Sequence, residues 1–136
     1  MLKKISSILA VFVLMAQTAR PEPWGGTTIT VTAGTAQRLI PAPPQLLAVS
    51  ISFQMAVAST GYGYVLFANP GTVCAVGGSG TTLIAQIGPG TSTSPGQQLV
   101  LPYPASPQNP KVNVRNYCVD GSVNGDHVTV TWNISN

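Results

Sequence analysis

Charged residues are scarce in this 136-residue chain, where Asp, Glu, Lys and Arg together make up 7%, against about 25% in an average soluble domain. Charge-driven disorder is excluded, because that class combines a large net charge with low hydrophobicity, and 44% of this chain is hydrophobic. The 14 glycines follow no three-residue period, which excludes a collagen-like chain. The length allows one compact domain.

Clustered cations are also lacking. The formal charge is +3, but Lys3, Lys4 and Arg20 fall at the start of the chain, and from residue 21 onward three cations oppose three acids: Arg38, Lys111 and Arg115 against Glu22, Asp120 and Asp126. A nucleic-acid surface needs clustered Lys and Arg to neutralise phosphates, so we expect no nucleic-acid partner. A neutral surface gives little repulsion between molecules, which favours contact with partner subunits.

Residues that could carry catalysis or bind a metal are few. A triad or a carboxylate pair needs positioned partners, and the chain has one histidine, His127, and three carboxylates. We therefore predict no enzyme and no catalytic residues. Asp120, Asn124 and Asp126 could bring three oxygens to a Ca²⁺ ion, but the same residue types cap turns, so the prediction is no metal site and no cofactor.

Cysteine occurs twice, at Cys74 and Cys118, so a single disulfide is possible without a choice of connectivity. No Cys-x-x-Cys motif accompanies them, which argues against a metal site. In an exported chain the bridge and two free thiols are equally expected, whereas a reducing cytosol favours free thiols. Both states stay open.

Residues 1–20 have the layout of a secretory signal, because Lys3 and Lys4 precede the apolar run Ile5–Ala16. A helix of that run would be about 18 Å long, short of the roughly 30 Å hydrocarbon core, so no stable transmembrane span is expected. Since the region after it has no clean Ala-x-Ala triplet, two alternatives stand: a cleaved signal, or a retained hydrophobic arm packed against another protein. Pro21–Gly26 predicts a Pro/Gly linker, which leaves residues 27–136 as the domain.

Beyond the linker, alternating apolar residues and turn signals predict an all-β fold. The expected strands are Thr27–Thr32, Gln37–Ile40, Leu47–Val57, Tyr62–Asn69, Thr81–Ile87, Gln97–Leu101, and two within Lys111–Val123 and Asp126–Ile134. The alternation in Leu47–Val57 turns one set of side chains to the core: Leu47, Val49, Ile51, Phe53, Met55 and Val57. Tyr62–Asn69 is almost continuously apolar, so we expect burial on both faces, with a subunit contact there. The fold prediction is a small antiparallel β-sandwich or jelly-roll-like barrel of seven to eight strands.

The dipeptide Asn124-Gly125 predicts a two-residue type I′ hairpin. Residue 123 then pairs with residue 126, Val119 faces Val130, and Tyr117 faces Trp132. One face of the hairpin is expected to be the core face, with Tyr117, Val119, Val128, Val130 and Trp132. Val112 and Val114 are out of phase with it, which predicts a bulge or bend near Arg115-Asn116.

Three stretches carry a resemblance to a known group of proteins. Pro95–Pro102 reads Pro-Gly-Gln-Gln-Leu-Val-Leu-Pro, Val112–Ile134 contains Val-Asp-Gly and Val-Asn-Gly-Asp-His-Val-Thr-Val, and Tyr64–Asn69 precedes a Gly-rich segment. In this arrangement, residues 27–136 resemble the small all-β virion proteins of tailed bacteriophages. The resemblance implies a capsid-decorating or other minor structural role, with no active-site residues to carry over. The apolar start departs from that pattern.

Two functions follow as hypotheses. The first is a non-enzymatic structural protein of a phage virion, on the head surface, whose partners are capsid or other virion proteins and copies of itself. The second is an exported bacterial β-sandwich binding or surface protein, secreted or periplasmic, with a cleaved signal peptide. A secreted hydrolase is a weaker third, because acid and base residues are nearly absent.

Overall fold

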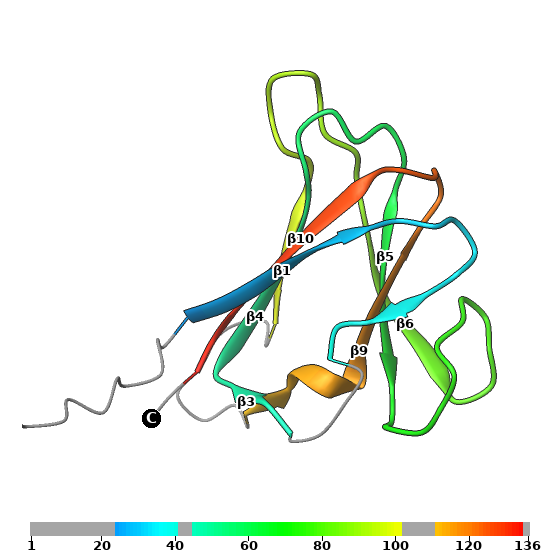
Figure 1. The fold of residues 1–136 in the computed structure, drawn as a ribbon, viewed down its shortest axis with the longest axis vertical. Helices are drawn as coiled ribbons and strands as arrows, with labels where there is room; N and C mark the ends of the chain where they lie inside the picture. The colour runs from blue at the N-terminus through cyan, green and yellow to red at the C-terminus, as the bar shows by residue number, and fades with distance from the viewer. Residues whose placement is uncertain (1–23, 41–44, 102–110, 135–136) are drawn as a thin grey trace, which may run out of the picture.

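The computed structural model describes residues 24–40, 45–101 and 111–134 (Figure 1). Within them the chain is all-β, with no α-helix and a single 3-10 turn, η1 (Val114–Asn116). The strands are β1 (Trp24–Thr30), β2 (Gln37–Arg38), β3 (Leu47–Ala48), β4 (Ser50–Met55), β5 (Gly63–Ala68), β6 (Thr81–Ile87), β7 (Gln98–Leu101), β8 (Val112–Asn113), β9 (Tyr117–Gly121) and β10 (His127–Asn133). This makes ten rather than the seven to eight predicted, because two expected strands each break into two.

The strands form three antiparallel sheets, in the orders β1-β10-β4-β7, β2-β9-β5-β6 and β3-β8. Among the described strands no sheet closes on itself, so the closed barrel of the alternative prediction is not formed. Figure 1 shows the two four-stranded sheets on opposite sides of the molecule. The all-β, antiparallel part of the prediction is confirmed.

One hydrophobic core is shared by the two four-stranded sheets. Its fully buried members include Phe53 on β4, Val130 on β10 and Val65 on β5. The Tyr117 ring of β9 lies 6.0 Å from the Phe53 ring of the other sheet and 5.7 Å from the Phe67 ring of its own, centroid to centroid. Such contacts between sheets make the two layers depend on each other for stability.

The expected strand Leu47–Val57 is interrupted at Val49. Before the break β3 pairs with β8, and after it β4 pairs with β10. Because the chain changes partner there, the alternation shifts: Ala48 is buried, whereas Leu47 and Val49 are exposed. Val57 is exposed as well, since β4 ends at Met55. The prediction was therefore right for Ile51, Phe53 and Met55 and wrong for Leu47, Val49 and Val57.

Strand β5 is covered on both faces, as predicted. Val65 belongs to the shared core, and its neighbour Leu66 faces the other way, into a second cluster with Ala68 and Cys118. The chain itself supplies this second cover, because Cys74 from the loop between β5 and β6 packs against the cluster.

The predicted hairpin is not formed. β9 and β10 belong to different sheets: Val119 lies opposite Val65 and Gln37, whereas Val130 lies opposite Phe53 and Thr27. A type I′ turn needs positive φ at both central residues, and only Gly125 has it, at 84°. The turn therefore carries the chain from one sheet to the other.

The faces assigned to these two strands are nonetheless confirmed. The buried core contains Tyr117, Val119, Val128 and Val130, and Trp132 packs against it. Trp132 lies opposite Gly25 rather than Tyr117, and a Cβ at Gly25 would overlap the indole. The expected bend near Arg115 is the 3-10 turn η1.

At the N-terminal side, β1 begins at Trp24, so the last three residues of the expected linker belong to a strand. Ile29 and Val31 are buried. The expected arm, residues 1–20, and the Pro-rich segment 102–110 lie outside the described residues. No helix in the described part of the chain has the length and apolarity to cross a membrane.

Candidate functional site

Asp126 holds two distant segments of the chain together. Its carboxylate is buried and accepts hydrogen bonds from the backbone N–H groups of Thr60, at 3.1 Å to each oxygen, and Gly61, at 2.6 Å. The same turn is fixed on its other side, where the Gly125 N–H donates to the Val31 carbonyl at 3.0 Å. Asp126 therefore anchors the loop between β4 and β5 to the turn between β9 and β10.

The other two residues considered for calcium are used in the same way. Asn124 accepts a hydrogen bond from the Ala33 N–H at 2.7 Å. Asp120 is buried and accepts from the N–H groups of Gly34 at 3.1 Å and Gly121 at 2.7 Å. Asn124 and Asp120 thus cap backbone N–H groups of turns, and most of these N–H groups are distant from them in the sequence. Within the described residues, no group of three or more His, Cys, Asp or Glu side chains is placed to hold a metal ion.

His127 is the first residue of β10 and its side chain is exposed. Its backbone is tied to the buried Ser59: the His127 N–H donates to Ser59 Oγ at 3.2 Å, and that hydroxyl donates to the His127 carbonyl at 3.3 Å. Ser59 is therefore engaged with backbone groups of β10.

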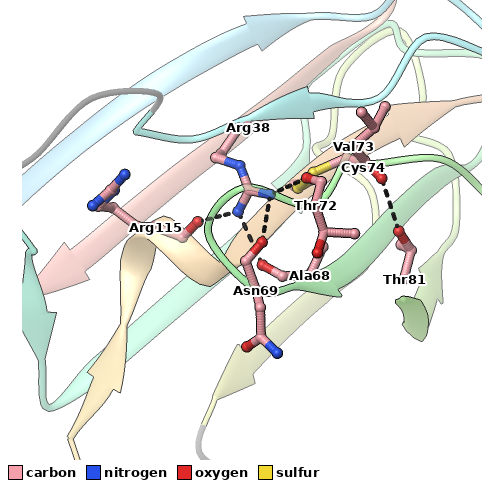
Figure 2. Close-up of a disulfide and its surroundings, with 9 residues drawn as sticks. Arg38, Ala68, Asn69, Thr72, Val73, Cys74, Thr81 and Arg115 are labelled. Atoms are coloured by element: carbon pink, nitrogen blue, oxygen red, sulfur yellow. Dashed lines mark hydrogen bonds between the residues drawn. A yellow bond between two sulfur atoms is a disulfide. The ribbon is translucent and has the colours of Figure 1, made fainter. Parts of the chain in front are cut away.

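Sequence reasoning did not single out Arg38. Its guanidinium donates hydrogen bonds to four backbone carbonyls (Figure 2). Its guanidinium donates to Ala68 O at 2.9 Å, Asn69 O at 3.1 Å and Thr72 O at 2.7 Å, and also to Arg115 O. Five donors in a planar fork suit such a set of acceptors. Arg38 thus ties the start of the loop between β5 and β6 to the end of η1.

Cys74 and Cys118 form a disulfide, with their Cα atoms 6.4 Å apart. Cys118 lies on β9 directly opposite Arg38 on β2. The bond and the guanidinium therefore hold the same loop, residues 69–80, against the outer face of the β5 and β9 pair (Figure 2). We call this combination the loop clasp: Arg38, Cys74 and Cys118.

Four exposed apolar side chains lie on β6 and on the loop that the clasp holds. Leu83 and Ile84 on β6 are 49% and 41% exposed, and Val73 and Val76 on the clasped loop are 82% and 48% exposed. The loop adjoins β6, because Thr81 Oγ1 donates to the Val73 carbonyl at 3.2 Å. We call these four residues the β6 surface.

The β6 surface lies in a part of the sequence that has no formal charge. From residue 39 to residue 110 the chain contains no Lys, Arg, Asp or Glu. Exposed apolar side chains grouped together commonly mark a site of contact with another protein. Leu83 and Ile84 were expected to belong to a strand, but the sequence pattern did not show that the strand would be an edge.

Comparison with protein-family models, curated proteins and solved structures finds no match to this chain.

Proposed function

We propose that this chain is a non-enzymatic structural protein of a phage virion, a decoration or minor capsid protein on the head. The observation that carries the proposal is the β6 surface, four exposed apolar side chains on β6 and on the loop fixed by the loop clasp. A rigid surface loses little conformational freedom on binding, so more of the contact energy is available for attachment. The resemblance of residues 27–136 to small virion proteins supports the same role.

The fold that we propose for this role is a β-sandwich, in which the two four-stranded sheets are the two layers. The shared core, with Phe53 from one sheet beside Tyr117 from the other, supports it. A sandwich suits an attachment protein because stability comes from the core, which leaves the loops and edges to make contacts.

The polar residues fit a structural role. Asp120, Asp126 and Arg38 donate or accept hydrogen bonds that hold loops in place. Groups used in this way stabilise a surface without taking part in a reaction. We accordingly propose that His127 has no catalytic function.

The test is the location of the protein in cultures that produce it. Particles purified on a density gradient should contain the chain in many copies, measured by quantitative mass spectrometry, and antibody labelling should place it on the head. Recovery of the protein only in the cell envelope or the medium, in fractions free of particles, would contradict the proposal.

A second candidate is an exported bacterial binding or surface protein. The Cys74–Cys118 disulfide favours it, because disulfides persist in oxidising compartments, and the signal-like residues 1–20 agree. Virion surfaces are also oxidising, so the bond suits both candidates. The intact mass of the isolated protein separates them: a chain that begins at Met1 or Leu2 favours the virion, and one that begins near residues 17–20 favours export.

A further inference from the structure

We propose that the chain forms a two-fold symmetric dimer in which β6 of one copy pairs with β6 of a second copy in antiparallel orientation. The two β2-β9-β5-β6 sheets would then become one continuous sheet across the dimer. The proposal assigns Leu83 and Ile84 of the β6 surface to a second copy and leaves Val73 and Val76 on the clasped loop for contact with a particle. It concerns association of the chain with itself, and its test is separate from the test of attachment to a particle.

The first observation is that β6 is a long edge strand that carries neither charge nor proline. It ends its sheet, with β5 on one side and no strand of the described residues hydrogen-bonded on the other. Monomeric proteins protect such edges with Lys, Pro or very short strands. β6 has seven residues, and none of them is charged or proline. The edge at the other end of the same sheet, β2, has two residues.

The second observation is the bulge in the middle of β6. Leu66 lies opposite Leu83 and Val65 lies opposite Ala85, so Ile84 is the extra residue, with no partner on β5. Bulges usually discourage edge pairing, yet this one leaves an isoleucine in solvent at the centre of the strand. In the proposed dimer this isoleucine would pack against its counterpart across the axis, which would remove apolar area from solvent.

The third observation indicates that the partner of β6 is a second copy of the chain. None of the four residues of the β6 surface is charged, and the Arg38 guanidinium beside the loop is engaged by backbone carbonyls. A second copy brings a neutral apolar surface of the same kind. Antiparallel edge strands are also self-complementary about a two-fold axis, which is the commonest symmetry of homo-oligomers.

The test introduces a positive or a negative charge at Ile84 in the full chain. A two-fold axis beside this residue would bring its two copies together. Ile84→Lys alone and Ile84→Glu alone should each sediment as monomers, since like charges meet at the axis. An equimolar mixture of the two should regain the dimer mass. Val57→Lys and Val57→Glu are the matched controls, because Val57 is an apolar side chain of similar exposure, 48% against 41% for Ile84, in the loop after β4. Both should stay dimeric.

Three results would overturn the proposal: a wild-type chain that is monomeric at high concentration, an Ile84→Lys chain that keeps the dimer mass, or a mixture that stays monomeric. Hydrogen exchange on the wild-type chain provides a test that needs no variant. Backbone amides of residues 81–87 should exchange at least tenfold more slowly at high than at low protein concentration, and equal rates would count against pairing. If the dimer forms but the protein is missing from particles, the proposed function fails and the dimer stands.

Discussion

Arg38 and Cys118 lie directly opposite each other on β2 and β9, and both bind the loop between β5 and β6. Arg38 binds the loop through hydrogen bonds to carbonyls, and Cys118 binds it through a covalent bond to Cys74. The loop carries Val73 and Val76 of the β6 surface. The loop clasp therefore connects the stability of the fold to the shape of the surface that we propose makes contacts.

Replacing Arg38 should destabilise the protein substantially. Arg38→Met removes four charge-assisted hydrogen bonds and leaves half-buried carbonyls without a donor. We expect the free energy of unfolding to fall by about 2–4 kcal/mol, since a bond to a charged group contributes roughly 1.5–3 kcal/mol and neighbouring bonds are not additive. Chemical denaturation with linear extrapolation measures it.

Arg38→Lys is the control for charge. Lysine keeps the positive charge but cannot reach four carbonyls with one ammonium group, so its stability should lie between the wild type and Arg38→Met. If Arg38→Met unfolds at the same denaturant concentration as the wild type, the guanidinium does not hold the loop.

Loss of the disulfide should be at least as costly. The bond joins residues 44 positions apart, and closing a loop of that size in the unfolded chain corresponds to about 4 kcal/mol in the chain-entropy model. The double variant Cys74→Ser, Cys118→Ala should lose about 2–4 kcal/mol. Mass spectrometry under non-reducing conditions should find no free thiol in the wild type, and alkylation of both cysteines without reductant would contradict the bond.

The placement of β9 and β10 in different sheets shows what the sequence could and could not predict. Period-two alternation correctly placed Val119 and Val130 on a core face, because alternation depends only on which side of a strand is buried. It could not show that the two strands belong to different sheets. A turn signal such as Asn124-Gly125 is local, and it is the same whether the chain returns along one sheet or crosses to another.

The contacts that direct the chain from one sheet to the other join residues that are distant in the sequence. Asn124 is bound by Ala33, and Asp126 by Thr60 and Gly61, at separations of 91, 66 and 65 residues. The loop clasp was hidden for the same reason, because the acceptors of Arg38 become neighbours only after β5 and β9 pair. The positions of β4, β5 and β6 were predictable, since each carries its own apolar pattern between turn residues.

Asp126 should prove essential to the turn between the sheets. Asp126→Ala leaves the buried N–H of Gly61 and the N–H of Thr60 without an acceptor. Unsatisfied buried groups cost about 1–3 kcal/mol each, so we expect a loss of about 2–4 kcal/mol, measured by denaturation. Asn124→Ala, which removes one exposed hydrogen bond, should cost less than about 1 kcal/mol. Equal effects of the two substitutions would contradict the anchoring role of Asp126.

Calcium should not alter the stability of this turn. Asp120 Oδ1, Asn124 Oδ1 and both carboxylate oxygens of Asp126 already accept backbone hydrogen bonds, so an ion would compete with these bonds. The melting temperature should be the same with millimolar CaCl₂ as with EDTA. A rise in melting temperature that depends on calcium would show that the carboxylates bind the ion in place of the backbone.

Tyr117 should make the protein sensitive to alkaline pH. Burial raises the pKa of Tyr117 above its usual value of 10.0, because the phenolate would lose its hydration. The unfolded chain therefore ionises first as pH rises, and stability that is complete below pH 10 falls as pH increases towards the raised pKa. Melts between pH 8 and pH 11 should show a steeper loss for wild type than for Tyr117→Phe. Parallel curves would mean that the phenol is as well hydrated as in the unfolded chain.

Removal of residues 1–20 tests the attachment arm. The segment Ile5–Ala16 is apolar and too short for a transmembrane helix, so a retained segment needs a protein surface on which to bury it. At about 25 cal/mol per Å² of apolar area, several large side chains contribute several kcal/mol before ordering costs. The described residues supply a shared core of their own, from Ile29 to Val130, so we expect the truncated chain to keep the melting temperature of the full chain.

Attachment should weaken at the same time. Full-length and truncated chains are mixed with particles that lack the protein, and the pelleted fraction is measured by quantitative mass spectrometry over a range of concentrations. We expect the truncated chain to need at least tenfold more protein for half occupancy, because the arm acts together with the β6 surface in one attachment. Val73→Lys in the full chain separates the two contributions, because Val73 is exposed on the clasped loop and lies outside the proposed dimer strand. If the arm carries the attachment, this variant binds better than the truncated chain. Equal occupancy of full-length and truncated protein would show that residues 1–20 have no part in attachment, which is the outcome expected of a cleaved signal.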